Sequence, residues 1–412
     1  MRLVEQAVGE GSSSRSELVF LSPIVPAATG NGLAIRAGLQ LEALSASFAV
    51  HVAVLPVAGG AADTSWAGRL AASLRVIDLK LGRSEQAAGA VELAGREAWR
   101  RRLGAASPLP HPAVVASPVL ARRVVAALDV PARTPIHAVR SYLAPLAVAV
   151  GESLEASWLT LDVDDDDQAL LQRQGDEAEA GAYERLLRVF GPLFEWLALS
   201  SPSEAAAVGR RLGLPTVVIP NAVDVVPART RRSARRGATL LFVGNLTYPP
   251  NVEAAVLLAR DILPRVRRLG DGDVRVELVG AFEPGGPVAE LKGLAGVELL
   301  GHVDDLGAAY GRADVVVAPL VHAAGTRIKV LEALAWGIPV VTTGPGAAGL
   351  DVTSGRDLLV ADDVDGIARA TALLVGDRDL AATLAASGRR LVADTYSRAA
   401  VGSALRALMP RR

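Results

Sequence analysis

The sequence VVVAPLVHAAGTRIKVLEALAWGIPVVTT, residues 315–343, decides the fold class. An apolar run at Val315–Ala318 predicts a short buried strand, and a second strand is predicted at Pro339–Thr342. Between them, apolar side chains at helical spacing predict a helix that Gly337 ends. Two strands joined by a helix in this way are typical of a parallel β-α-β unit.

Outward from this unit, short apolar strands alternate with helices along the whole chain. The other predicted strands are Leu18–Leu21, Ala49–Leu55, Val114–Ser117, Ile136–Val139, Trp158–Asp162, Leu197–Ser200, Val217–Pro220, Leu240–Val243, Val274–Val279 and Val297–Leu300. Long helices are predicted at Glu85–Leu103 and Asp176–Trp196, and a further helix follows Pro250. The pattern indicates an α/β protein with two doubly wound, Rossmann-like domains facing a central cleft, where the C-terminal ends of the strands form the ligand-binding edge.

Changes in composition give the expected domain boundaries. Residues 1–16 are polar and predicted to be a disordered lead-in without the apolar core of a signal peptide. Residues 17–228 form the first domain, and the arginine-rich segment 229–238 forms a linker. Residues 239–395 form the second domain, and a helix is expected in residues 396–412.

Composition excludes several classes of function. The chain has 412 residues, a formal net charge of -1 and no cysteine, which excludes disulfides, thiol catalysis and cysteine-ligated zinc. The near-zero charge gives no electrostatic reason to expect a nucleic-acid partner. The apolar runs are shorter than the ~20 residues of a membrane-spanning helix. We expect a cytoplasmic protein, either soluble or peripheral at the inner face of the membrane.

The helix within residues 315–343 carries the clearest chemistry. It is predicted to start near Gly325 or Thr326, which places Arg327 and Lys329 in its first turn. Cations are unfavourable at the positive end of a helix dipole unless an anion binds there, so the pattern indicates a phosphate site. Glu332, one turn further, is suited to ribose hydroxyls. In the alternative interpretation this is an ordinary surface helix, in which Glu332 simply neighbours Ile328 or Lys329.

At this point the sequence resembles glycosyltransferase family 4, whose members have the GT-B fold. The resemblance rests on motifs that occur in the family's order: IPNAVD at 219–224, FVGNLTYPPNVEA at 242–254, GHVDDL at 301–306, GTRIKVLEALAWGIPVVTT at 325–343 and GLDV at 349–352. They cover most of the second half. The first half matches more loosely, through the early strand and Gly30-Asn31-Gly32, and the chain also resembles sugar transferases of bacterial envelope or exopolysaccharide assembly.

The resemblance implies that the two domains bind different substrates. The first domain would bind the acceptor, the second would bind a nucleotide-diphosphate sugar, and the C-terminal helix would cross back to the first domain. The implied donor-binding residues are Gly30, Asn31, Gly32, Gly244, Asn245, His302, Val303, Gly325, Thr326 and Glu332, with Arg327 and Lys329 as the catalytic pair that holds the diphosphate.

Two departures from the family pattern affect these expectations. Many members carry a glutamate that contacts the donor sugar where this chain has Ala324, which leaves the choice of sugar open. Many also carry an arginine and a lysine after the strand that ends at Val243, where this chain has Asn245 and Pro249–Asn251. Because of the second departure, we expect Arg327 and Lys329 to be the pair that neutralises the charge of the diphosphate.

The implied activity is a glycosyl transfer of EC class 2.4, from a nucleotide sugar to a glycan, a lipid-linked or a small-molecule acceptor. Retention of anomeric configuration is implied, with no metal and no cofactor. One alternative is a non-catalytic homologue that binds sugar nucleotides, which Ala324 suggests. Others are an NAD-dependent oxidoreductase, although no GxGxxG turn follows the first strand, and another enzyme of the same fold, such as an epimerase or a phosphorylase with pyridoxal phosphate on Lys329.

Further polar residues lie in the first half. His137 and Arg140, at the end of a predicted strand, are candidates for contact with an acceptor. The acidic run at 162–167 is interpreted as a strand end followed by an acidic helix start rather than as a divalent-metal site, and an acceptor contact there is left open. His51 is expected to be structural. The arginines at 100–102 are expected to be a solvated helix end, with attraction to anionic lipid as the alternative.

Overall fold

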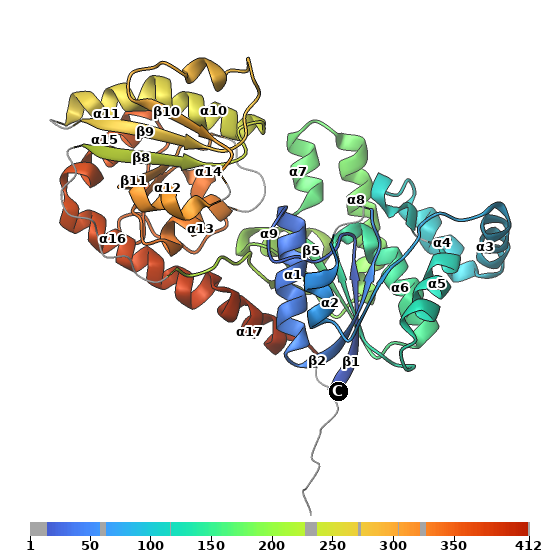
Figure 1. Cartoon of the computed structure of the whole chain (residues 1–412). Coiled ribbons are helices and arrows are strands. Elements are labelled where there is room, and N and C mark those ends of the chain that lie inside the picture. Colours follow the sequence, from blue (N-terminus) through green and yellow to red (C-terminus); the bar gives the residue numbers. More distant parts are fainter. Residues whose placement is uncertain are drawn as a thin grey trace, which may run out of the picture. The chain divides into compact units, whose positions relative to one another are not determined.

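Two parallel β-sheets organise the chain in this computed structural model (Figure 1). The structure describes residues 15–57, 63–115, 117–226, 237–270, 273–303, 305–321 and 327–410. Contacts divide the chain into a first unit of Met1–Ala198, Leu212–Pro215 and Leu405–Arg412, and a second unit of Leu199–Arg211 and Thr216–Ala404. The predicted linker falls mostly outside the described residues.

In the described part of the chain, the first sheet has seven strands in the order β3-β2-β1-β4-β5-β6-β7. Their bounds are β1 Ser16–Ser22, β2 Phe48–Val54, β3 Ser73–Val76, β4 Ile136–Val139, β5 Leu159–Asp164, β6 Leu197–Leu199 and β7 Thr216–Val218. β1 pairs in parallel with β2 and with β4, where Val19 lies opposite Ile136. The strand order reverses at β1, so the ligand-binding edge is at the C-terminal ends of β1 and β4.

Helices lie on both faces of this sheet; α1 packs beside β2 and α2, whereas α6 packs beside β4 and β5 (Figure 1). Their bounds are α1 Gly32–Ser45, α2 Ser65–Leu70, α3 Arg83–Gly95, α4 Glu97–Ala106, α5 Pro118–Leu128, α6 Ala144–Leu154, α7 Asp167–Arg173 and α8 Glu177–Phe190. The helix α9 spans Pro202–Leu212.

Three predictions for the first half were wrong in detail. The single helix expected at Glu85–Leu103 is two helices, because Arg96, with φ -103° and ψ 83°, leaves helical geometry between α3 and α4. The strand expected at Val114–Ser117 is a 3-10 turn over His111–Val115, and Pro118 then begins α5. The helix expected to reach Trp196 ends at Phe190, where Gly191 and Pro192 start another short 3-10 turn.

The second sheet has six strands among the described residues, in the order β10-β9-β8-β11-β12-β13. They are β8 Ala238–Val243, β9 Val274–Val279, β10 Val297–Gly301, β11 Val315–Ala318, β12 Val340–Thr342 and β13 Leu359–Val360. The strand pairs are parallel, and Val316 lies opposite Val340 in the β11–β12 pair. The strands predicted in this half are therefore confirmed.

Helices also sandwich the second sheet: α10 and α11 lie on one face and α12 and α13 on the other (Figure 1). The helices are α10 Pro249–Leu257, α11 Leu263–Leu269, α12 Leu306–Arg312, α13 Ile328–Ala335, α14 Gly344–Ala347, α15 Val364–Gly376, α16 Arg378–Leu391 and α17 Arg398–Leu408. A π-turn over Leu258–Ile262 joins α10 to α11, so the helix predicted after Pro250 is nearly continuous. Its buried face, with Ala255, Ile262 and Val266, is part of the second unit's core.

Candidate functional site

Polar residues gather at the C-terminal edge of the second sheet. The strand order reverses at β8, whose neighbours are β9 on one side and β11 on the other. In doubly wound sheets, ligands bind at this point, where successive crossovers leave in opposite directions. The loop after β8 begins at Gly244, and the helix after β11 is α13. The two motifs at the loop after β8 and at α13 therefore meet at this edge, where Lys329 bonds Asn251.

Lys329 lies in the first turn of α13, as predicted. The helix begins at Ile328, and Arg327 is its N-cap with φ -82° and ψ 45°. The helix therefore starts later than the expected Gly325 or Thr326, and both of these residues, with Ala324, lie outside the described residues. Arg327 and Lys329 still occupy the positive end of the helix dipole, where their charges are unfavourable without an anion.

The Lys329 ammonium group reaches towards the loop after β8. Its Nζ donates a 2.9 Å hydrogen bond to Asn251 Oδ1 and lies 5.9 Å from the centre of the Phe242 ring. Asn251 Nδ2 in turn donates to the carbonyl of Asn245 at 2.9 Å. Burial lowers the pKa of Lys329 to about 8, although Glu332 opposes this shift. The ammonium group is thus partly desolvated, and a bound anion would stabilise its charged form and raise its pKa again.

Glu332 has a different partner. Its Oε2 accepts a 3.0 Å hydrogen bond from the Tyr310 hydroxyl, and the Tyr310 ring stacks on Trp336 with centroids 5.5 Å apart. Burial raises the pKa of Glu332, while Tyr310 and Lys329 act against that rise. Glu332 and Lys329 each bond to a residue of another element in the unit. The interpretation as an ordinary exposed pair on one helix does not account for these two contacts.

Backbone packing brings the loop after β8 against the end of β9. Gly280 follows β9 with φ +142°, and a Cβ atom there would lie 1.7 Å from the Gly244 carbonyl oxygen. A Cβ on Gly244 would lie 3.0 Å from Asn251 Nδ2. Gly280 is therefore required for the close approach of the two loops, whereas a Cβ on Gly244 would crowd the Asn251 side chain that bonds Lys329.

The remaining second-unit candidates lie on neighbouring loops. Asn245 is exposed, and its Oδ1 accepts hydrogen bonds from the Thr247 backbone and hydroxyl at 3.1 and 2.9 Å. His302 follows β10 directly and is exposed, whereas Val303 is half-buried and packs on the core. Gly244 and Asn245 thus lie on the loop after β8, and His302 and Val303 lie on the loop after β10, which is separated from β8 by β9.

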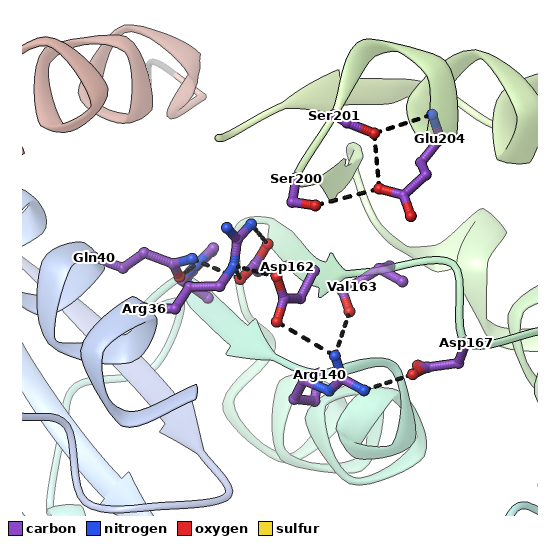
Figure 2. A network of polar contacts seen from close by, with 11 residues as sticks. Arg36, Gln40, Arg140, Asp162, Val163, Asp167, Ser200, Ser201 and Glu204 are labelled. Carbon is purple, nitrogen blue, oxygen red and sulfur yellow. Dashed lines mark hydrogen bonds and ion pairs between the residues drawn. The ribbon is translucent and has the colours of Figure 1, made fainter. Parts of the chain in front are cut away.

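Arg327 borders a second group of polar side chains within the second unit. Its Nε donates to the Pro345 carbonyl at 3.1 Å. A small polar pocket beside it is lined by Ser200, Ser201, Glu204, Pro220, Asn221, Arg327, Leu331, Ala348, Gly349, Leu350 and Tyr396. Figure 2 shows the Ser200 and Ser201 hydroxyls directed at the Glu204 carboxylate, at 3.2 and 2.8 Å.

The glycine-rich loop of the first unit leads into α1. Asn31 is the N-cap, and its Oδ1 accepts a 2.9 Å hydrogen bond from the Ala34 backbone. Gly30 has φ +117°, which favours glycine, but a Cβ on Gly30 or Gly32 would meet no atom within 4 Å. Packing within the unit therefore does not require Gly32. The predicted role of this loop in donor binding stays a prediction.

His137 and Arg140, the predicted acceptor-side residues, differ in their surroundings. His137 is 0% exposed, its ring nitrogens lie 2.8 Å from Thr160 Oγ1 and 2.9 Å from Gln40 Oε1, and burial lowers its pKa to about 4. It presents no atom at the surface of the unit, so we leave it out of the proposed contacts. Arg140 is half-buried at the end of β4, with Nη2 2.6 Å from Asp167 Oδ1 (Figure 2).

The acidic run has the predicted secondary structure. β5 ends at Asp164, Asp166 caps α7, and α7 begins at Asp167. No group of three or more metal-binding side chains with suitable geometry is found in the described residues. His51 bonds Glu17 and Ser73 at 2.6 and 2.8 Å, contacts that tie β2 to its two neighbouring strands. Arg102 bonds Glu152 at 2.8 Å.

Comparison with known proteins agrees with this arrangement. Residues 237–377 match the family model described as glycosyl transferases group 1. A phosphatidyl-myo-inositol mannosyltransferase from Mycobacterium leprae (strain TN) is 35% identical over 143 residues. This match covers 32% of the chain and 36% of the relative, so it spans about a third of the relative's length.

Solved structures match almost the whole chain. HepE from Anabaena, in complex with UDP and glucose, has a TM-score of 0.63 at 14% identity, over 95% of this chain and 99% of its own. Sucrose-phosphate synthase from Thermosynechococcus elongatus has a TM-score of 0.62 at 16% identity, over 96% and 98%. The chain has the GT-B glycosyltransferase fold. The predicted fold class is thereby confirmed.

Sequence reasoning missed several residues of this GT-B chain's second unit. Asn251 was noticed only as a departure from the family pattern, and Tyr310 was not noticed, although they hold Lys329 and Glu332. Asn221 and Gly349 fall in recognised motifs, IPNAVD and GLDV, but their position beside Arg327 could not be read from the order of the motifs. In the described residues, none of the helices is sufficiently long and apolar to span a membrane.

Proposed function

We propose that the protein transfers a glycosyl group from a nucleoside-diphosphate sugar to a hydroxyl group of an acceptor. The observation that carries this proposal is the partly desolvated Lys329 ammonium group at the N-terminus of α13, beside Arg327. Two cations at the N-terminus of a helix favour a bound diphosphate. The family match over residues 237–377 covers this helix and supports the same reading.

The rest of the donor follows from the surroundings of α13. Glu332, one turn along the helix, would accept hydrogen bonds from ribose hydroxyls, and the loop at His302 and Val303 would lie beside the base. Structures of Anabaena HepE contain UDP and UDP-glucose, which supports a uridine nucleotide as the first donor to test. In this proposal the hydroxyl, amide and carboxylate groups of the polar pocket beside Arg327 are candidates for contact with the donor sugar.

The proposed chemistry is a front-face substitution with retention, as in family 4. The bond between the anomeric carbon and the diphosphate oxygen breaks, and a bond to the acceptor oxygen forms on the same face. The acceptor's proton passes to the departing diphosphate. Arg327, Lys329 and the helix dipole stabilise the negative charge that develops on that leaving group, so catalysis is mainly positioning and electrostatic. The proposal requires no metal or cofactor.

Acceptor and cellular setting belong to the same proposal. The resemblance to envelope and exopolysaccharide transferases and the match to a mannosyltransferase favour a hydroxylated glycan, lipid-linked or small-molecule acceptor, and a role in polysaccharide synthesis. We propose a cytoplasmic site of action, with contact at the inner face of the membrane. The non-catalytic and oxidoreductase alternatives gain no support from the comparisons.

Nucleotide binding by the full chain tests the donor part directly. Thermal unfolding is followed with UDP, GDP, ADP, dTDP and NADH, for the unaltered protein, Lys329→Ala, and the exposed-lysine control Lys292→Ala. A ligand at ~100 times its Kd stabilises a protein by about 2.7 kcal/mol. We expect one nucleoside diphosphate to stabilise the unaltered protein and Lys292→Ala but not Lys329→Ala. Stabilisation by NADH alone, or equal stabilisation of all three proteins, contradicts the proposal.

Turnover then separates a transferase from a non-catalytic homologue. The nucleotide sugar of the stabilising base is incubated with the protein, and NMR follows release of the nucleoside diphosphate and the anomeric configuration of the sugar product. Slow transfer to water or to an added polyol with retention supports the mechanism. Binding without any release of diphosphate supports the non-catalytic alternative.

A further inference from the structure

A network of charged side chains occupies the C-terminal ends of β4 and β5 in the first unit. Arg36, from α1, contacts Asp162 through Nε and Nη2 at 2.7 and 2.6 Å, and Gln40 Nε2 also donates to Asp162 at 2.6 Å (Figure 2). Arg140 bonds Asp167, and the Ser141 hydroxyl donates to the same carboxylate at 2.8 Å. Asp162 and Asp167 therefore have close hydrogen-bond donors.

Asp164 differs from these two neighbours. Its Oδ2 receives one long hydrogen bond, 3.4 Å from Arg140 Nη1. Its Oδ1 lies 3.1 Å from Arg36 Nε as an ion pair, but it is buried and accepts no hydrogen bond within the described residues, because that N–H is directed at Asp162. A carboxylate has about four acceptor positions, so Asp164 keeps unused hydrogen-bonding capacity although it is only 9% exposed.

The backbone at Asp164 and Arg140 adopts conformations that are energetically unfavourable for residues other than glycine. Both are non-glycine residues with positive φ, 74° for Asp164 and 77° for Arg140, and the Arg140 backbone N–H donates to the Asp162 carbonyl at 2.6 Å. Such conformations cost about 1–3 kcal/mol each and persist where the surrounding structure imposes them. The backbone thereby holds both residues at the C-terminal ends of β4 and β5.

We propose that Asp164 and Arg140 form a binding site for a hydroxyl group of a neutral, polyhydroxylated molecule such as a monosaccharide or a cyclitol. The hydrogen bonds of Arg140 Nη1 to other described residues are long, 3.4 Å to Asp164 and 3.5 Å to the Val163 carbonyl, and the guanidinium also lies over the Tyr142 ring. The Arg140 guanidinium can donate and the Asp164 carboxylate can accept a further hydrogen bond, so together they match a hydroxyl group, which both accepts and donates. Rotation about χ2 of Asp164, which has a broad profile, would turn Oδ1 towards the ligand.

The charge of the network favours a neutral ligand over an anionic one. More carboxylates than guanidinium groups lie here: Asp162, Asp164, Asp165 and Asp167 interact with Arg36 and Arg140. Burial raises the pKa of Asp164 to about 6, so its carboxylate is ionised at neutral pH and would repel a phosphate. If the proposed glycosyl transfer holds, the neutral polyol is the acceptor, and that identification rests on the proposed function.

Saturation-transfer NMR on the full chain without any nucleotide tests the site. The probes are glucose, mannose and myo-inositol, each at millimolar concentration and pH 7.5, with glucose 6-phosphate as the anionic counterpart. Asp164→Asn and Asp164→Gly remove the charge and suit the positive φ, so both are expected to fold. Asp129→Asn is the matched control, because Asp129 also has positive φ, 50°, and is exposed elsewhere in the unit.

We expect at least one neutral probe to bind the unaltered protein and Asp129→Asn, and to bind both Asp164 variants at least about tenfold more weakly. Glucose 6-phosphate should bind more weakly than glucose. Absence of signal from every neutral probe, or equal binding by the Asp164 variants, overturns the proposal. Because no donor is present, failure of the Lys329 site leaves this result unaffected.

Discussion

Each unit places charged side chains at the C-terminal edge of its own parallel sheet, but the side chains come from differently spaced parts of the sequence. In the second unit, Arg327, Lys329 and Glu332 lie within six residues on one helix. In the first unit, Arg36 and Asp162 are 126 residues apart and come from α1 and β5. The second-unit site can therefore be recognised in a continuous stretch of sequence, whereas the first-unit network exists only after the sheet has formed.

The units also differ in how their charges are paired. Asp162 and Arg36 are 0% and 1% exposed and neutralise each other, so this pair is part of the first unit's interior. Lys329 is desolvated with a neutral amide as its hydrogen-bond partner, which leaves its charge for a ligand. Paired buried charge indicates a structural role, and desolvated charge without a close counter-ion indicates a binding role. Four predictions test this distinction.

The largest effect is expected from breaking the buried pair. Asp162→Ala leaves the Arg36 guanidinium buried without its main counter-charge, which costs about 3–5 kcal/mol of the free energy of unfolding. Urea denaturation of the first unit's transition measures this loss. The double variant Arg36→Met/Asp162→Leu removes both charges and should lose much less. A loss below about 1 kcal/mol in Asp162→Ala would show that the pair is not structural.

A smaller effect, in catalysis rather than folding, is expected at Arg327. Its charge at the N-terminus of α13 would stabilise the leaving diphosphate most strongly in the transition state. Arg327→Ala should therefore lower the transfer rate by about 10²-fold while leaving the free energy of unfolding nearly unchanged. The control is Arg268→Ala, which removes an exposed arginine of the same unit. Equal rates for the two variants would remove Arg327 from the mechanism.

The third prediction concerns pH. Because the pKa of Lys329 is lowered to about 8, its charge is present at pH 7 and lost as the pH rises through 8. A diphosphate binds the charged form, so nucleotide affinity should be constant below about pH 8 and fall by up to tenfold per pH unit above it. Calorimetric titration between pH 7 and 9.5 measures the slope. Lys329→Arg keeps its charge throughout, and a similar decline in that variant would assign the slope to another group.

These contrasts explain how much the sequence could predict. The strands of the second half and the position of Lys329 in the first turn of α13 follow from local periodicity and helix-end chemistry, which need no tertiary information. The polar pocket beside Arg327 could not be predicted, because Asn221 and Gly349 are 128 residues apart and meet only through the fold. The surroundings of Asp164 were missed for the same reason: the acidic run gives the strand end and the helix start, but not which carboxylate lacks close donors.

The helix break at Arg96 shows that a local pattern can also predict a structure that does not form. Residues 83–106 have a nearly continuous helical composition, so periodicity alone predicts one helix. The structure has two helices, and in the second one Trp99, only 5% exposed, packs against Phe190 with ring centroids 5.8 Å apart and donates a hydrogen bond from its indole nitrogen to Glu152. Contacts of this kind, between residues distant in the sequence, favour a separate direction for α4 and cannot be seen in the local pattern.

The smallest effect is expected where a neutral group supports the ligand-binding charge. Tyr310→Phe removes the hydroxyl that donates to Glu332 Oε2 and keeps the ring that stacks on Trp336. The free energy of unfolding should fall by about 1 kcal/mol, because a half-buried carboxylate loses one hydrogen bond. The pKa of Glu332, already raised by burial, should rise further, since the hydroxyl had been lowering it. Thermal unfolding at pH 7 measures the first effect, and carboxyl NMR shifts measure the second.

If Glu332 binds ribose hydroxyls, nucleotide affinity should fall only slightly, because the carboxylate remains in place and one of its oxygens becomes available to the ligand. A large loss of affinity with an unchanged free energy of unfolding would instead mean that Tyr310 itself contacts the nucleotide, and the division between charge that supports the fold and charge that meets the ligand would have to include this hydroxyl.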